Sequence, residues 1–350
     1  MNSFLRLSSR DRRLAFLQAG DRIRLPAASV EKDLWVCWTL RALWGLPEAG
    51  KSLTFKGGTS LSKVWKIIER FSEDIDLIVD KEPLGFAGEA SPDRALSAKQ
   101  RKRRLETLVE ACRQWVQESL KPAFARCIGE ALGPAGWTLE VDPDAEDGQC
   151  LLFTYPGVFP PTEAGYVRPV VKIELGARSD DWPWENMVIT PYAADALPEL
   201  IRDATVIVRT LTAERTFWEK AMLLHEETFR PPDKSRKLRL ARHYYDLWCL
   251  ITKGVADRAA ADRALFARVA EHREVFFRWT WVDYNTLKPG SLRLLPAADH
   301  EAGWRHDYEA MQGPMFFGKV PSFDEILRVV GDFERQFNQS APSPPPGRSP

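Results

Sequence analysis

The chain has 350 residues, enough for one large or two modest domains with an ample apolar core. Hydrophobic residues make up 44% of the sequence and charged residues 28%, which is ordinary for a soluble globular protein. The formal net charge of +0 excludes a protein that coats nucleic acid by bulk charge, although a local basic patch could still grip an RNA.

Neither the N-terminus nor the cysteines indicate export. Arginines interrupt any apolar signal sequence near the start, and no run approaches the ~18 apolar residues that span a bilayer. The five cysteines show no regular spacing and are expected to be reduced core residues. We therefore expect a cytoplasmic protein that does not cross a membrane.

Two helices are expected before the first strand. One covers about residues 10–18 and stops near Gly20, and the next runs from a capping Ser29 to Leu43. Residues 31–33 (Glu-Lys-Asp) are interpreted as the exposed first turn of this second helix, with a structural role.

A short strand then ends at the glycine pair Gly57-Gly58, where the backbone can adopt a positive φ or approach a ligand closely. Thr59 and Ser60 follow as helix-start residues whose hydroxyls can bond free amides. Apolar residues at helical spacing predict one amphipathic helix that continues to Phe71.

Two aspartates follow at strand spacing. Asp74 and Asp76 alternate with apolar residues, so both carboxylates leave the same side of one strand. Their backbones lie roughly 7 Å apart, within reach of a common divalent ion. Beside a helix start that suits a phosphate, this pair is the layout of a phosphoryl or nucleotidyl transfer site. The alternative is a glycine turn and a strand whose charged edge faces water.

The middle of the chain combines a long helix with more strands. After a loop at 80–97, a helix is expected from about residue 98 to residue 128, with basic residues in its first turns. Such a cluster opposes the helix dipole, so it indicates either contact with a phosphate backbone or a solvated face. Strands at 137–141, 150–155 and 168–175 should extend the sheet.

Turns are expected over 177–198, followed by a strand at 206–209 and two helices. Lys220 projects from the edge of the apolar face of the first helix, where it reaches water or is held by a partner such as a triphosphate. Arg242 and Asp246 lie four residues apart on the second, and the plain account is a surface ion pair worth ~0.3–0.5 kcal/mol.

The expected domains are residues 1–209, with N-terminal helices and a sheet-based core, and 210–337, a helical C-terminal subdomain. Residues 338–350 form a Pro/Ser-rich tail that should be disordered.

The sequence GGTSL, followed by a helix and RFSEDIDL, resembles the first motif of the AbiEii/AbiGii toxin family. That family, which includes MenT-like enzymes, belongs to the DNA polymerase beta-like nucleotidyltransferase superfamily. Weaker blocks of similarity continue to about Ile251. The resemblance implies an α+β fold, with a mixed sheet flanked by helices and a helical C-terminal subdomain.

The resemblance also implies the site. Asp74 and Asp76 would hold Mg²⁺ or Mn²⁺ with a third carboxylate on a later strand, for which Glu174 is preferred and Glu140 is the rival. Lys220 and Asp246 would join them as catalytic residues. The residues implied to bind the nucleotide and its phosphates are Lys56, Gly57, Gly58, Thr59, Ser60, Arg70, Lys220 and Arg242.

The implied function is that of a type IV toxin in an abortive-infection phage defence, moving nucleotides from an NTP to an acceptor, above all RNA such as a tRNA 3′ end. The implied partner is an AbiEi-like antitoxin that forms no stable complex. Two alternatives stay open: a transferase that modifies a protein or small molecule, and an inactive NTP-binding module of the same fold. Scattered histidines argue against a zinc site.

Overall fold

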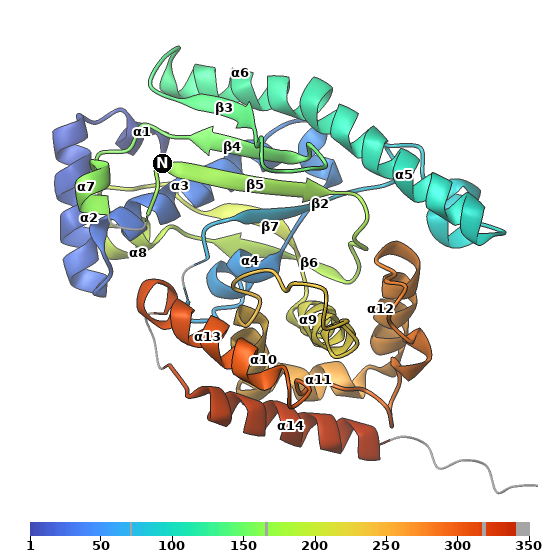
Figure 1. Cartoon of the computed structure of the whole chain (residues 1–350). Helices are drawn as coiled ribbons and strands as arrows, with labels where there is room; N and C mark the ends of the chain where they lie inside the picture. Colours follow the sequence, from blue (N-terminus) through green and yellow to red (C-terminus); the bar gives the residue numbers. More distant parts are fainter. Residues whose placement is uncertain (71, 165–166, 317–319, 341–350) are drawn as a thin grey trace, which may run out of the picture. The chain divides into compact units, whose positions relative to one another are not determined.

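The computed structural model describes residues 1–70, 72–164, 167–316 and 320–340 (Figure 1). The chain forms two compact units, Met1–Lys66 with Ser72–Thr212, and Ile67–Phe71 with Ala213–Pro350. The second unit therefore begins three residues after the expected boundary and also includes a short segment from the first half of the chain.

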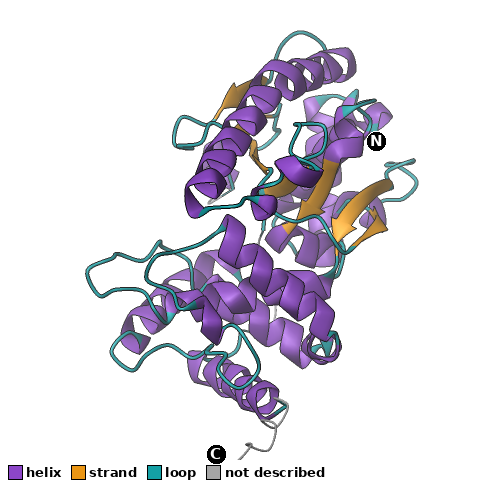
Figure 2. Ribbon diagram, turned by 90° about the vertical axis from the view of Figure 1, so that its right-hand side faces the viewer, coloured by secondary structure: helices purple, strands orange, loops and turns teal. Residues whose placement is uncertain are grey.

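The first unit is built on a seven-stranded mixed sheet in the order β3-β4-β5-β2-β1-β7-β6. Neighbouring strands pair antiparallel, except that β2 with β5 and β1 with β7 are parallel. The strands, orange in Figure 2, are β1 Leu53–Lys56, β2 Ile75–Val79, β3 Thr138–Val141, β4 Cys150–Thr154, β5 Val170–Gly176, β6 Trp184–Ile189 and β7 Val206–Leu211. The expected α+β class and mixed sheet are confirmed.

Helices surround this sheet within the first unit. Those expected at 10–18 and 29–43 are present and longer, and the helix expected from residue 98 continues through a π-helical segment, Trp115–Leu120. The α-helices are α1 Asn2–Leu5, α2 Ser9–Ile23, α3 Ala27–Trp44, α4 Gly57–Lys63, α5 Ala98–Gln114, α6 Lys121–Leu132, α7 Pro161–Ala164 and α8 Tyr192–Ala196.

Aromatic contacts join α3 and α6 to one face of the sheet. Trp35 on α3 stacks on Tyr155 with ring centroids 5.1 Å apart, and it meets Phe153 of β4 edge to face at 6.0 Å. Phe124 on α6 contacts the same Phe153 at 5.9 Å. Such rings bury large apolar areas, so this face forms the core of the unit.

The prediction that residues 31–33 form an exposed turn is wrong, because all three side chains are buried. Lys32 is 3% exposed, and its ammonium donates to the carbonyls of Arg168 and Val170 and pairs with Glu73 at 2.9 Å. One cation therefore ties α3 to the start of β5 and to the residue just before Asp74.

Asp33 fixes α3 to two further elements. Its carboxylate pairs with Lys63 at the end of α4 at 2.7 Å and accepts a hydrogen bond from the backbone N–H of Tyr192 on α8 at 2.7 Å. The ammonium of Lys63 also lies 3.6 Å from the Tyr192 ring centroid. Buried charges persist when they are paired in this way, which sequence periodicity does not reveal.

Glu31 makes stability depend on pH. Its carboxylate accepts from the N–H of Val158, yet burial raises its pKa from 4.5 to about 7. As pH rises from 4.5 to about 7, the unfolded chain releases a proton that the folded chain keeps, so folding stability falls. Glu31→Gln should therefore raise the free energy of unfolding by about 3 kcal/mol at pH 8 and by little at pH 4.5.

Urea unfolding at the two pH values measures this difference. The exposed control Glu130→Gln should stay within about 0.5 kcal/mol of the parent at both. An equal effect of Glu31→Gln at both pH values would show that the carboxyl is not the titrating group.

The helix after the glycine pair is shorter than predicted. α4 ends at Lys63, and Lys66 adopts a left-handed backbone with φ +52°, which a continuing α-helix does not allow. Ile67 and Ile68 are buried in the second unit instead of extending the helix. Phe71, the expected last member of the apolar stripe, lies outside the described residues.

The turn-rich connection expected at 177–198 also holds regular structure. It contains the strand β6, which pairs with β7 along its whole length, and the helix α8. The six residues of β6 and the five of α8 are too short for a clear periodic signal, and β6 is stabilised by its pairing with β7.

The second unit consists of helices packed around aromatic side chains. Trp218 lies at its centre, with ring centroids 4.7 Å from Phe266 and 5.0 Å from Phe337. The helices are α9 Ala213–Glu227, α10 Arg242–Thr252, α11 Val255–Ala261, α12 Arg263–Phe276, α13 Glu301–Met315 and α14 Phe323–Gln339.

The expected start of a disordered tail at residue 338 is wrong, because α14 runs through Gln339. The side chain of Asn338 bonds the backbone of Gly290 and Leu292, which fixes the end of the helix. In the described part of the chain, no helix combines the length and apolar character needed to cross a membrane.

Candidate active site

The predicted site residues fall into two groups, one within each unit. In the first unit, Asp74 directly precedes β2 and Asp76 lies on it. Ile75 and Leu77 are buried in the sheet core, whereas both aspartates are half-buried. Side chains alternate along a strand, so the two carboxylates share the face opposite the aromatic core.

Glu174 is the carboxylate that the sheet brings to this pair. In the parallel ladder between β2 and β5, Asp76 and Glu174 are direct partners. Glu140 is exposed on β3, and β4 and β5 separate it from β2. The register therefore favours Glu174 over Glu140 as the third acidic residue.

Gly57 brings the glycine turn against Asp76. Its φ is +80°, and a Cβ at this position would lie 2.0 Å from Oδ2 of Asp76. No other residue type fits, because both the backbone conformation and the space require glycine. The carboxylate of Asp76 thus lies directly over the first residue of α4.

Gly57→Ala should displace the Asp76 carboxylate and destabilise the fold by more than about 1 kcal/mol. Gly85→Ala is the matched control, since Gly85 has φ +85° but open space around its missing Cβ. We expect the nucleotide transfer that the resemblance implies to be lost in the first variant and kept in the second. Loss of transfer in both would assign the effect to backbone strain and not to the carboxylate.

The hydroxyls of Thr59 and Ser60 do not cap the helix as expected. Thr59 Oγ1 donates to the carbonyl of Asp74 at 2.6 Å, and Ser60 Oγ donates back to the carbonyl of Gly57 at 2.9 Å. α4 begins at Gly57 itself, so both residues already lie inside its first turn. Their hydroxyls therefore hold the turn and Asp74 in place.

Two lysines border the acidic face. Lys56, the cross-strand partner of Asp76, donates to Ser179 Oγ at 2.7 Å. Lys172 lies two residues before Glu174 on the same strand face and pairs with its Oε1 at 3.1 Å. Although burial lowers the pKa of Lys172, its contacts with Glu174 and Asp142 outweigh this and raise it. The sequence analysis assigned no role to Lys172, although its position two residues before Glu174 places both side chains on one face of the strand.

Burial and neighbouring carboxylates both act on Asp74. Burial, then the nearby Glu174 and Glu73, raise the pKa of Asp74. In the part of the chain that the structure describes, no three Asp, Glu, His or Cys side chains are already gathered to hold a metal ion. Mg²⁺ commonly binds through one or two carboxylates together with substrate phosphates and water. The chemistry of these carboxylate oxygens therefore fits a divalent cation such as Mg²⁺.

The second group is a buried ion cluster in the second unit. Asp246 is fully buried, and both its oxygens accept from Arg70, at 2.7 and 2.8 Å. Lys220 of α9 pairs with the same carboxylate at 2.8 Å. Burial alone would raise the pKa of Asp246, but the two cations outweigh it and hold it well below its ordinary value. The plain account of Arg242 and Asp246 as a surface ion pair is wrong, because Asp246 faces inward to these partners.

His243 is a further member of this cluster that sequence reasoning missed. Its Nδ1 lies 3.4 Å from Nζ of Lys220. Burial and the charges of Lys220 and Arg242 hold the pKa of His243 well below 6.5, so its neutral ring can accept from the ammonium. The sequence could have indicated this contact, because His243 lies three residues before Asp246 and therefore on the same side of α10.

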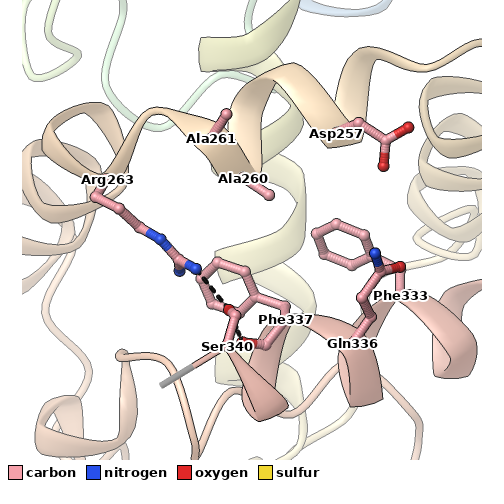
Figure 3. A pocket seen from close by; sticks show the side chains of 8 residues that line it. All are labelled: Asp257, Ala260, Ala261, Arg263, Phe333, Gln336, Phe337 and Ser340. Atoms are coloured by element: carbon pink, nitrogen blue, oxygen red, sulfur yellow. Dashed lines mark hydrogen bonds between the residues drawn. The ribbon is translucent and has the colours of Figure 1, made fainter. Parts of the chain in front are cut away.

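A pocket of about 360 Å³ lies among α11, α12 and α14, with Phe333 and Phe337 among its lining residues (Figure 3). Arg263 at its rim lies 4.8 Å over the Phe337 ring. The pocket contains none of the predicted site residues, so it is separate from both groups.

The chain was compared with models of known protein families. Residues 38–329 match the family described as nucleotidyl transferase AbiEii toxin, type IV TA system. Among curated proteins, the search found no match to the chain.

A solved structure is similar to most of the chain. MenT4, a nucleotidyltransferase toxin from Mycobacterium tuberculosis H37Rv, aligns over 96% of this chain and 91% of its own, with a TM-score of 0.50 and 16% identity. JHP933 from Helicobacter pylori aligns over 88% and 90%, with a TM-score of 0.37 and 13% identity. At these identities, the likeness to MenT4 supports the fold alone.

The match over residues 38–329 confirms the resemblance carried by the glycine pair and the two aspartates: the chain belongs to the AbiEii family of nucleotidyltransferase toxins of type IV toxin–antitoxin systems.

Proposed function

We propose that the chain transfers nucleotides from an NTP to an RNA acceptor, such as a tRNA 3′ end, in a Mg²⁺-dependent reaction. The supporting observation is the close approach of Asp76 Oδ2 to Gly57, with Glu174 opposite on the next strand. A helix start beside clustered carboxylates suits a nucleotide whose phosphates share a cation with the protein.

Asp74 and Asp76 are the proposed Mg²⁺ ligands, assisted by Glu174. When bound, the ion would polarise the phosphates and offset charge on the leaving pyrophosphate. Thr59 fixes the backbone of Asp74, and Lys172 orients Glu174. The backbone at Gly57 and Gly58, with Lys56 beside it, is the proposed contact for phosphates.

In the second unit, Lys220 and Arg242 are the proposed phosphate contacts. Asp246 is fully buried and bound to Lys220 and Arg70, so we assign it a positioning role that sets the direction of the Lys220 ammonium. The same geometry makes Arg70 a structural partner of Asp246 and less suited to touch the nucleotide itself.

As a type IV toxin, the chain has an antitoxin as its genetic partner. We propose that this is an AbiEi-like protein encoded nearby, that it acts without a stable complex, and that the pair serves phage defence.

Incubation with each labelled NTP, Mg²⁺ and total RNA tests the proposal. We expect label in RNA, and its loss when EDTA removes the metal. Label on protein or a small molecule would favour the alternative acceptors. Metal-dependent NTP binding with no labelled product would indicate an inactive module of the same fold.

A further inference from the structure

One segment of the second unit concentrates positive charge in a chain whose formal net charge is +0. This basic segment, residues 230–242, connects α9 to the first residue of α10. It carries six Arg or Lys residues and one acidic residue, Asp233. Such a local excess attracts polyanions even when the whole protein is neutral.

Two of these cations serve the fold. Arg230 binds Glu227 with two hydrogen bonds of 2.6 and 2.7 Å. Arg236 lies 3.5 Å from the same carboxylate and 3.9 Å over the ring of Trp304. Their charges are therefore already satisfied by the protein.

Three of the other cations lie at the surface. Lys234, Lys237 and Arg239 are exposed. Across the described residues, no carboxylate lies within ion-pairing distance of Lys234 or Lys237. Between Lys237 and Arg239, Leu238 is 87% exposed, an unusual place for a large apolar side chain.

The backbone of the basic segment is held at both ends. Arg230 donates to the carbonyl of Ser235 at 3.4 Å. Near α10, the carboxylate of Asp307 accepts from the N–H groups of Arg239 and Ala241 at 2.7 and 2.8 Å. Arg239 has φ +62°, a left-handed conformation that non-glycine residues rarely adopt and that surrounding contacts must maintain. The exposed cations thus project from an ordered backbone, which lowers the entropy cost of binding.

The basic segment leads directly into the Lys220 cluster. Arg242 begins α10, and Asp246, which holds Lys220, follows one turn later. A ligand bound along the segment would therefore approach the cluster that we assign to phosphate contact.

We infer that the basic segment binds the phosphodiester backbone of the acceptor RNA through Lys234, Lys237 and Arg239. This inference rests on the proposed function. The three cations are spread over six residues, which suits successive phosphates of a polynucleotide better than one compact triphosphate. The exposed Leu238 can contact a base or ribose between them.

The cluster at the start of α5 is the rival basic surface and provides a matched control. Lys99 and Lys102 are exposed there, and Lys102 has Glu106 at 3.9 Å. Lys99→Gln/Lys102→Gln removes the same charge from the protein as Lys234→Gln/Lys237→Gln, so a difference between the two pairs reports position and not net charge.

Binding of a fluorescent single-stranded RNA, measured without NTP at several salt concentrations, is the test. We expect Lys234→Gln/Lys237→Gln to weaken RNA binding about tenfold and to reduce the salt slope by about 1.4. The α5 pair should stay within about twofold, and Mg²⁺-dependent binding of NTP should not change in either protein. Thermal unfolding checks that both variants are folded.

Three results would overturn the inference. Lys234→Gln/Lys237→Gln could bind RNA with parental affinity, the α5 pair could lose as much RNA affinity as this variant, or Lys234→Gln/Lys237→Gln could lose NTP binding in place of RNA binding. None requires turnover, so the test stands apart from the proposed transfer reaction. RNA bound as expected by a protein that labels no acceptor would contradict the proposed function and leave the RNA surface intact.

Discussion

Asp76→Asn should lower nucleotide transfer by more than about 10³-fold while leaving the fold intact. The amide keeps the shape of the side chain over Gly57 but removes the charge that a cation shared with the nucleotide requires. Transfer of labelled nucleotide in Mg²⁺ measures the loss, and thermal unfolding checks the fold.

Glu140→Gln is the control, because Glu140 is exposed on β3 and two strands separate it from β2. It should keep parental activity, whereas Glu174→Gln should lose most of it. If Asp76→Asn turned over NTP at the parental rate, the acidic face would not be the site of catalysis.

Asp246→Asn should destabilise the second unit by about 3–5 kcal/mol, because it leaves the buried charges of Arg70 and Lys220 without their partner. Since contacts depress the folded pKa of Asp246, its contribution is present above pH 4 and is lost as pH falls through that lower pKa. Hydrogen exchange of the α10 amides and urea unfolding at pH 7 measure the effect.

The exposed Asp257→Asn, in the same unit, should change stability by less than about 0.5 kcal/mol. An Asp246→Asn protein with parental α10 protection and parental transfer would contradict both the structural and the positioning role of this cluster.

The sequence predicted the sheet and the acidic pair because both rest on local patterns. Alternation around Asp74 and Asp76 assigns them to one face, and a glycine pair before a short helix indicates a close approach. The resemblance already preferred Glu174 to Glu140, and the strand order, which places β5 and not β3 beside β2, supports that preference.

The burial of Lys32 and Asp246 was not predicted, because it depends on partners far away along the chain. Lys32 is buried because its acceptors, the carbonyls of Arg168 and Val170, lie more than 130 residues away. Asp246 faces inward because Arg70 reaches it from 176 residues earlier. Helical spacing assigns charged residues to the surface, and only tertiary pairing can reverse that assignment.

The membership of Ile67–Phe71 in the second unit makes that unit discontinuous in the chain. A fragment that starts at Ala213 would lack the guanidinium of Arg70 and would fold around Asp246 with half of its charge compensation missing. The two units therefore cannot be separated by one cut, and a split protein would regain the cluster only if the missing peptide were supplied in trans.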